Sequence, residues 1–131
     1  MIVDASAVLA ILFDEPDADR YATALADHAT RLMSVANYVE VGLRLVHGQQ
    51  TPIPLRRLEV FLRDSGIRLQ AVSPEQGRMA IEAYRDFGKA SGSPAQLNYG
   101  DCFAYALAKE TGMPLLSKGE DFTHTDIEAV L

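Results

Sequence analysis

Short apolar stretches alternate with longer helical patterns along this chain, and that alternation limits the folds open to it. Strands are predicted in "MIVD", "RLMSV", "IRLQAV" and "MPLLS", with "DIEAVL" as a candidate last strand. The segments between them repeat apolar residues at helical spacing. Strands that alternate with helices favour a parallel sheet covered on both faces. The sequence therefore predicts an α/β fold, a three-layer α/β/α sandwich with a central, mostly parallel sheet.

The predicted helices cover most of the remaining chain. They span residues 5–15, 16–29, 35–48, 55–66, 73–89 and 98–112. Ser34 is the expected N-cap of the third helix, and Gly48 is its expected stop. One apolar stripe of that helix contains Val35, Val39, Leu43 and Val46. Residues 51–54, "TPIP", are predicted to separate it from the next helix.

The chain is long and apolar enough to form one domain. It has 131 residues, of which 48% are hydrophobic, and no linker divides it, so a single domain is predicted over residues 1–131. No apolar run approaches the roughly 18 residues expected of a membrane helix. The start is a poor signal peptide, because it lacks a basic region and has an acid at position 4. With one cysteine and no internal disulfide, a cytoplasmic protein is expected.

The net charge of the chain, −6, bears on the class of partner. Taken alone, it argues against a generic nucleic-acid-binding protein, since phosphate binding favours a basic surface. A protein of this charge that binds a polyanion needs local positive charge or a bound cation to overcome its own field.

Two acids lie at or just beyond the ends of predicted strands. Asp4 comes after "MIV", and Asp121 follows "MPLLS" across a short turn. Ligand sites in parallel sheets form outside the carboxyl ends of the strands, so both acids can lie at one edge of the sheet. The alternative for Asp4 is an N-cap of the next helix, and the two roles are compatible. The alternative for Asp121 is a turn acid, and Glu120 beside it is a competing candidate.

Two further acids belong to predicted helices. Glu40 lies in a largely apolar helix and shares a face with Asn37 and Arg44. A surface ion pair with Arg44 is the alternative for it. Asp101 opens a helix, where the helix dipole alone would explain an acid. Gly100 before it is expected to let the chain turn tightly into that helix.

A cluster of these four carboxylates would require neutralisation. Two carboxylates about 4 Å apart repel by roughly 4 kcal/mol at an effective dielectric constant of about 20. They therefore share protons or bind a cation. Oxygen ligands without His or Cys suit Mg²⁺ or Mn²⁺. Zinc is disfavoured, because Cys102 stands alone and the three histidines, His28, His47 and His124, show no ligand spacing.

Three stretches of the chain carry a resemblance to a known family. They are "MIVDASAVLAILFDEP", "ANYVEVGLRL" and "LNYGDCFAYALAKETGMPLLSKGEDFTHTDI". The sequence resembles the PIN-domain family and, more narrowly, the VapC-type ribonuclease toxins of type II toxin–antitoxin pairs. The match runs nearly end to end, and the order of the acids agrees. The last stretch is the most specific of the three.

The resemblance implies a Mg²⁺- or Mn²⁺-dependent endoribonuclease that a cognate VapB-type antitoxin inhibits. By motif, Asp4, Glu40, Asp101 and Asp121 match the four family acids, which bind metal and are catalytic. Ser6 and Ser117 match supporting hydroxyl positions. Many PIN domains have an acid or Asn where this chain has Gly119, which leaves open whether Asp121 binds metal directly or through water. A homodimer is also implied.

Other residues keep two interpretations. The arginines Arg56, Arg57 and Arg63, with Arg68 just beyond, are the candidate path for the RNA substrate, and the alternative is a solvated helix face with interleaved acids. Cys102 beside Asp101 is interpreted as a core residue rather than a nucleophile. Five apolar positions could form an antitoxin groove or a dimer surface, but core packing is expected for most of them. They are Phe13, Leu43, Val46, Phe61 and Leu62.

Three rival classes of protein are considered. A phosphoacceptor signalling domain needs an acid at the end of a middle strand, and "RLMSV" ends without one. A phosphatase of the haloacid dehalogenase type needs a second acid two residues after Asp4, where Ser6 stands. The third rival is a non-catalytic PIN-like module that binds metal or RNA, or serves for interaction. The four intact acids favour the enzyme.

Overall fold

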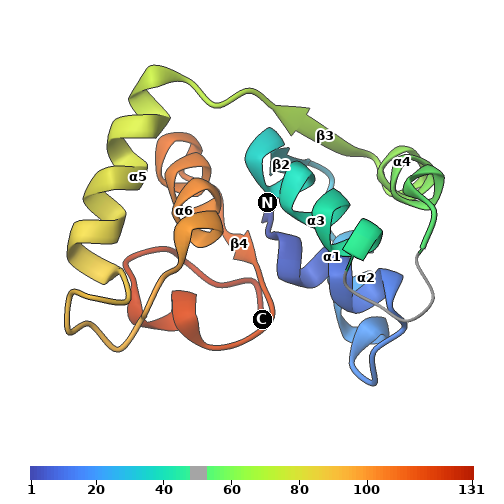
Figure 1. The fold of residues 1–131 in the computed structure, drawn as a ribbon. Coiled ribbons are helices and arrows are strands. Elements are labelled where there is room, and N and C mark those ends of the chain that lie inside the picture. The colour runs from blue at the N-terminus through green and yellow to red at the C-terminus, as the bar shows by residue number, and fades with distance from the viewer. Residues whose placement is uncertain (48–52) are drawn as a thin grey trace.

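The computed structural model describes residues 1–47 and 53–131, and it has the predicted three-layer α/β/α architecture (Figure 1). Its strands are β1 (Ile2–Val3), β2 (Arg31–Ser34), β3 (Ile67–Gln70) and β4 (Leu115–Leu116). They lie in the order β3-β2-β1-β4, and every pairing between them is parallel. The carboxyl ends of the neighbouring strands β1 and β4 therefore lie at the same end of the sheet.

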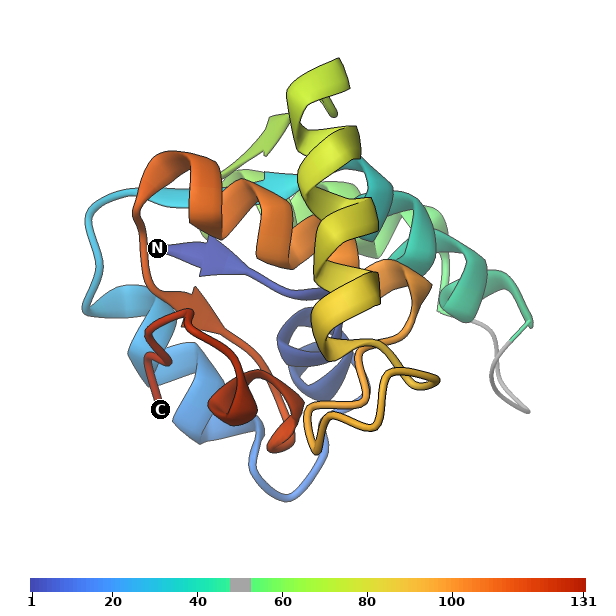
Figure 2. The same ribbon diagram turned by 90° about the vertical axis from the view of Figure 1, so that its left-hand side faces the viewer.

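Helices cover both faces of this sheet. Four lie on one face, α1 (Ala5–Leu12), α2 (Ala18–Ala26), α3 (Val35–His47) and α4 (Leu55–Asp64). The other face is covered by α5 (Pro74–Phe87) and α6 (Tyr99–Thr111), which Figure 2 shows in front of the strands. Successive strand residues alternate between the two cores, as in β1, where Val3 packs with the first set of helices and Ile2 with the second.

Two of the helices begin at serine side chains that cap them, and Ser34 was the predicted cap of α3. The Ser34 hydroxyl accepts a hydrogen bond from the Ala36 N–H at 3.3 Å, and Ser73 caps α5 in the same manner. The first helix is shorter than predicted, because Asp14 adopts a left-handed conformation with φ of 51°. Gly48 and the break at residues 51–52 lie outside the described residues. None of the helices described is long and apolar enough to cross a membrane.

The buried face of α3 is not the face that carries its most regular apolar stripe. The predicted stripe faces solvent, with exposed fractions of 37%, 50%, 62% and 43% for Val35, Val39, Leu43 and Val46. The buried residues are instead Asn37, Val41 and Leu45. Core packing, expected for Leu43 and Val46, is therefore wrong for these two, while Leu62 is buried and Phe13 and Phe61 are partly buried against the core.

The C-terminal segment also differs from the prediction. The candidate strand in residues 126–131 is wrong, because this segment forms only an isolated bridge between Ala129 and Leu115. Its partner strand β4 is two residues long, so there is little ladder to extend. A short 3₁₀ helix over Asp121–His124 precedes it and was not predicted. Phe122 of that helix is buried and anchors the segment in the core.

Candidate active site

Asp4 lies directly after β1 and caps the start of α1 with one of its two oxygens. Its Oδ2 accepts hydrogen bonds from the Ser6 N–H at 2.9 Å and the Ser6 hydroxyl at 2.5 Å. Its Oδ1 is buried and has no hydrogen-bond partner in the described part of the chain. The side chain is only 3% exposed, and this burial raises the pKa of Asp4. The N-cap interpretation is therefore correct for Oδ2, and it leaves Oδ1 without a structural role.

Ser6 connects Asp4 to the segment that follows β4. The same hydroxyl that donates to Asp4 accepts a hydrogen bond from the Lys118 N–H at 2.9 Å. The Lys118 ammonium is also paired with Glu15 and Asp17, which fastens this segment to the start of α2. Ser6 thus has a supporting position. Ser117 follows β4 directly, and its side chain makes no hydrogen bond to any residue that the structure describes.

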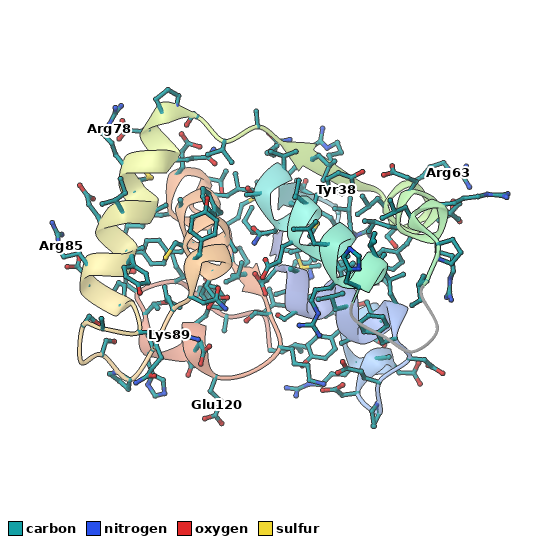
Figure 3. The ribbon with its side chains drawn as sticks, in the orientation of Figure 1. Tyr38, Arg63, Arg78, Arg85, Lys89 and Glu120 are labelled. Atoms are coloured by element: carbon teal, nitrogen blue, oxygen red, sulfur yellow. The ribbon has the colours of Figure 1, made fainter. Side chains whose placement is uncertain are left out.

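Asp121 begins the 3₁₀ helix in the segment held by Ser6 and Lys118. Its side chain is exposed, but its charge reaches the cluster, because it contributes to raising the pKa values of Asp4 and Asp101. Glu120, the competing candidate, makes no such contribution, and Figure 3 shows it pointing away from the body of the molecule. Asp121 is therefore the better placed of the two acids.

Asp101 opens α6 in a reciprocal capping box. Its Oδ2 accepts from the Asn98 N–H at 2.8 Å, while its own N–H donates to the Asn98 side chain at 2.9 Å. The pKa of Asp101 is raised to about 7, chiefly by burial and in smaller part by the charges of Asp4, Asp121 and Glu40. The helix start alone therefore does not account for this acid, because its carboxylate is held among three others.

Glu40 reaches the cluster from α3, on the opposite face of the sheet from α6. Its Oε2 accepts a hydrogen bond from the Asn37 amide at 3.2 Å, and its carboxylate lies against the backbone of Gly100. Burial raises the pKa of Glu40, and the charge of Asp4 adds to this. No ion pair joins Glu40 to Arg44 within the described residues, so the predicted alternative of a surface pair does not hold.

The structure thus brings Asp4, Glu40, Asp101 and Asp121, the acid cluster, to one edge of the sheet. Two features of the site were missed from the sequence. Asn37 was noted only as a neighbour of Glu40 on one helix face, although it is the residue that binds Glu40. Gly100 was expected to allow a turn, but it lies inside α6, and what requires glycine there is the closeness of the Glu40 carboxylate.

The acid cluster matches a hard divalent cation in the chemistry of its ligands. All four side chains offer carboxylate oxygens, and the orphaned Oδ1 of Asp4 is a buried ligand atom that no hydrogen bond uses. Within residues 1–47 and 53–131, no group of three or more acid, His or Cys side chains is arranged so that it could hold a metal ion. Among divalent cations, Mg²⁺ depends least on a complete set of protein ligands, because it usually keeps several waters and takes only one or two carboxylates.

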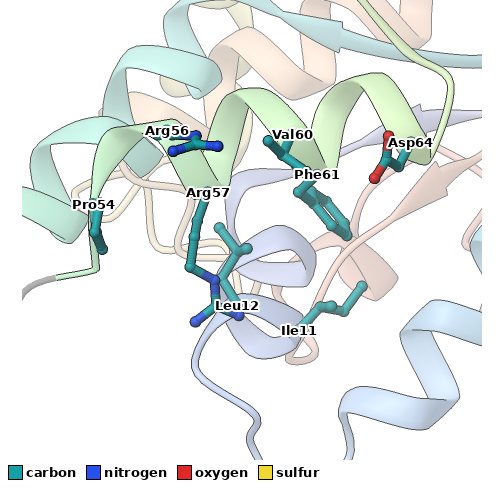
Figure 4. Close-up of a pocket in the computed structure, with 8 residues that line it drawn as sticks. All are labelled: Ile11, Leu12, Pro54, Arg56, Arg57, Val60, Phe61 and Asp64. Atoms are coloured by element: carbon teal, nitrogen blue, oxygen red, sulfur yellow. The ribbon is translucent and has the colours of Figure 1, made fainter.

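The predicted arginines lie apart from the acid cluster. Arg56 and Arg57 of α4 line a groove of about 580 Å³ against Ile11 and Leu12 of α1, and none of the four acids lines it. Figure 4 shows Arg57 extending from α4 toward Leu12. Arg63 is exposed, forms an ion pair with neighbouring Asp64, and points into solvent (Figure 3).

Cys102 follows Asp101 but is no candidate nucleophile. Its thiol is buried, and burial raises its pKa to about 11. The thiol therefore stays protonated at neutral pH, and only the thiolate is strongly nucleophilic. The predicted core role of Cys102 agrees with this, since it packs with Ala80 and Leu107 in the core between α5, α6 and the sheet.

The family model and the similar sequences both place this chain in one protein family. The family model for the PIN domain matches residues 1–128. Ribonuclease VapC28 of Mycobacterium tuberculosis is 46% identical over 131 residues, which cover 100% of this chain and 98% of that protein. Ribonuclease VapC30 of the same species is 48% identical over 131 residues, covering 99% of this chain and 98% of that protein.

Comparison with solved structures agrees on the fold. The crystal structure of VapC20 of Mycobacterium tuberculosis, described as a sarcin–ricin loop cleaving toxin, has a TM-score of 0.71 at 14% identity. The alignment covers 96% of this chain and 95% of that one. FitAcB from Neisseria gonorrhoeae also has a TM-score of 0.71, at 15% identity, over 98% of this chain and 94% of that one.

Proposed function

Because the chain belongs to the PIN-domain family and, within it, to the VapC ribonucleases, we propose that it is the toxin of a type II toxin–antitoxin pair. In this proposal residues 1–131 form one PIN-like domain in the cytoplasm, which hydrolyses RNA phosphodiester bonds with Mg²⁺ or Mn²⁺. The observation that carries the proposal is the buried, unpartnered Oδ1 of Asp4 among three further acids.

A divalent cation, when bound, would activate a water molecule and neutralise charge that develops on the scissile phosphate. Asp4 and Asp101 would hold it, with Glu40 and Asp121 beside them. Ser6 keeps Oδ2 of Asp4 engaged, which leaves Oδ1 as the ligand atom. The capping box likewise engages Oδ2 of Asp101 and fixes the direction of its side chain. The acids thus supply ligands whose orientation is set before the metal arrives.

The clustered carboxylates would repel the phosphates of RNA, and a bound cation would offset this repulsion. The chain has a net charge of −6, so the positive charge for phosphate binding has to be local. Arg56, Arg57 and Arg63 stay a prediction for the RNA path. Since none of the acids lines the groove of Arg56 and Arg57, we expect these arginines to act on affinity and not on the chemical step.

The partners are a cognate antitoxin, which inhibits the enzyme, and a second copy of the chain. The exposed apolar residues of α3 support the homodimer, because Val39 and Leu43 border a groove of about 440 Å³ with Tyr99 and Phe103 of α6. Leu43 is 62% exposed and Tyr99 is 79% exposed. Contiguous apolar surface of this kind marks protein interfaces. Sedimentation should give a dimer, and Leu43→Glu should convert it to a monomer; a monomeric parent would overturn this part.

The central experiment is RNA cleavage by purified protein freed of any antitoxin. Cleavage should require Mg²⁺ or Mn²⁺, stop with EDTA and resume when the cation is returned. The alternative is a non-catalytic PIN-like module that binds metal or RNA, or serves for interaction. It predicts binding without cleavage under the same conditions. Parent protein that cuts no RNA over a panel of structured and single-stranded substrates would favour that alternative.

A further inference from the structure

Asn37 is a fully buried polar residue of α3 whose amide joins two parts of the acid cluster. Its side chain is 0% exposed. Its Nδ2 donates to the Gly100 carbonyl oxygen at 3.0 Å and to Oε2 of Glu40 at 3.2 Å. Because both partners are hydrogen-bond acceptors, only the nitrogen of the amide can face them. The remaining oxygen, Oδ1, is buried and has no partner in the part of the chain that the structure describes.

The unpartnered Oδ1 makes Asn37 a poor choice for packing alone. A buried carbonyl oxygen without a hydrogen bond lowers stability, whereas an apolar side chain of similar size adds no such cost. The next residues on the same buried row of α3, Val41 and Leu45, are apolar. What asparagine supplies at this position, and an apolar residue cannot, is the pair of hydrogen bonds that its nitrogen donates.

Gly100 provides the second half of the contact. A Cβ atom added there would lie 2.5 Å from Oε2 of Glu40 and 2.7 Å from its Cδ and Oε1, which is closer than such atoms can approach. The Glu40 carboxylate is therefore packed directly against the first turn of α6. Asp101 is the next residue along this turn, so Asn37 holds one acid and the backbone that precedes another.

We propose that Asn37 is a positioning residue that, with Gly100, clamps the Glu40 carboxylate against the start of α6 and so sets the spacing between Glu40 and Asp101. This inference rests on the proposed function of the acid cluster as a cation site. Glu40 is partly exposed and the two carboxylates repel each other, so an unclamped Glu40 would turn toward solvent. Asn37 opposes that movement from α3, while the glycine leaves room for the carboxylate.

The test is a titration of RNA-free protein with Mn²⁺, in which the free ion is followed by electron paramagnetic resonance. Asn37→Leu should weaken Mn²⁺ binding by roughly 10- to 100-fold, the range typical of residues that orient metal ligands. Gly100→Ala should weaken it similarly, by displacing Glu40. Thermal melts in EDTA should show Asn37→Leu as folded, since the variant loses two bonds but also the orphaned oxygen.

Two matched controls separate the clamp from general effects of mutation. Gln76 is also a buried amide, 5% exposed, and it donates to a carboxylate, Glu110, away from the acid cluster. Gly77 lies in a helix, α5, and has open space at its Cβ position. Gln76→Leu and Gly77→Ala should therefore leave Mn²⁺ affinity unchanged, although they make the same kinds of substitution.

A double-mutant cycle shows whether Asn37 acts through Glu40. In the background of Glu40→Ala, Asn37→Leu should cause no further loss of Mn²⁺ affinity, because the residue that it positions is gone. An independent loss there, or Mn²⁺ binding by Asn37→Leu equal to that of the parent, would overturn the clamp. If Asn37→Leu does not fold, Gly100→Ala decides alone, since alanine suits a helix better than glycine.

The failure of the clamp is distinguishable from the failure of the proposed activity. A parent protein that binds Mn²⁺ but cleaves no RNA contradicts the ribonuclease, while weaker Mn²⁺ binding by Asn37→Leu would still support the clamp. A parent that binds no Mn²⁺ contradicts the cation site and the clamp together. If the parent cleaves RNA, and Asn37→Leu and Gly100→Ala both bind Mn²⁺ as tightly as the parent does, only the clamp is contradicted.

Discussion

Carboxyl groups of the acid cluster and of the C-terminal segment have pKa values shifted in opposite directions. In the C-terminal segment, Asp126 accepts hydrogen bonds from the Lys109 ammonium and from the Tyr105 hydroxyl, and the bond from Lys109 is the main cause that lowers its pKa. In the acid cluster, burial raises the pKa values of Asp4, Glu40 and Asp101. No Lys, Arg or His side chain is paired with any of the cluster's acids among the described residues.

The difference separates a structural role from a functional one. Asp126 ties the C-terminal segment to α6 with partners that the chain itself supplies. The acid cluster lowers the stability of the metal-free fold, because buried like charges are unfavourable without a counter-charge. The chain pairs an acid with a lysine at one place and leaves four acids together at another, and this contrast supports the proposal that a cation from outside the chain completes the acid cluster.

The largest expected effect is loss of cleavage when an acid of the cluster is neutralised. Asp4→Asn and Asp101→Asn should each lower RNA cleavage by on the order of 100-fold or more, beyond the roughly 10-fold to 100-fold effect of residues that only orient metal ligands. Asp126→Asn, an acid from the paired region, should cleave as the parent does. Thermal melts in EDTA should show the two cluster variants as stable as the parent or more so. Normal cleavage by either would disprove the assignment of the site.

A second prediction concerns pH and the metal-free protein. The pKa of Asp101 is about 7 in the folded state and near its ordinary value of 3.8 in the unfolded chain. Between these values the folded state binds more protons, so its stability should fall as pH rises from about 4 to about 7 and then level off. Thermal melts in EDTA should decrease by on the order of a few degrees over this range.

Two additions to that experiment identify the group responsible. Asp101→Asn should make the fall shallower, though not abolish it, because Asp4 and Glu40 also have raised pKa values. Saturating Mg²⁺ or Mn²⁺ should remove most of the fall, since the ion favours the ionised carboxylates. Stability that rises with pH over this range in EDTA would contradict the raised pKa of Asp101.

The third prediction, of intermediate size, concerns Ser6. Ser6→Ala removes the hydroxyl that donates to Asp4 and accepts from Lys118, so it should lower cleavage by roughly 10-fold and stability by about 1 kcal/mol. Ser91→Ala is the matched control, because its hydroxyl also donates one bond, to Gly88, and accepts one, from Ser93, within the loop between α5 and α6 and with no bond to an acid of the cluster. Equal cleavage by both variants would show that Ser6 has no part in orienting Asp4.

The layers of the fold and the family could be predicted because they depend on features that repeat along the sequence. Apolar strands alternating with helices indicated the parallel sheet, and the motifs around Asp4, Glu40 and Asp101 indicated the PIN-domain family and a toxin-type ribonuclease, which the comparisons confirm. The meeting of Asp4 and Asp121 at one edge followed from the rule that parallel strands end on the same side.

The face of α3 could not be predicted, because two rows of that helix are apolar. The row of Val35, Val39 and Leu43 was the more regular, while the row that is buried contains a polar residue, Asn37. Periodicity alone gives no reason to bury an asparagine. The reason is tertiary: its amide binds Glu40 and the Gly100 carbonyl, and the latter lies 63 residues away in sequence.

The smallest expected effect concerns the ion pair between Lys109 and Asp126 in the C-terminal segment. Lys109→Met removes the ammonium that binds Asp126 and keeps the length of the side chain. Partly exposed ion pairs of this kind contribute about 0–1 kcal/mol, so urea unfolding at neutral pH should detect only a small loss, and cleavage should be unchanged. Because the pKa of Asp126 is lowered in the folded state, the contribution exists above about pH 4 and disappears as pH falls through that lowered value. Parent and variant should therefore become equal in stability in acid, where the acid cluster is protonated and least destabilising. A difference that grows on acidification would mean that Asp126 is not held ionised by Lys109, and that the two regions do not differ in the way their pKa values indicate.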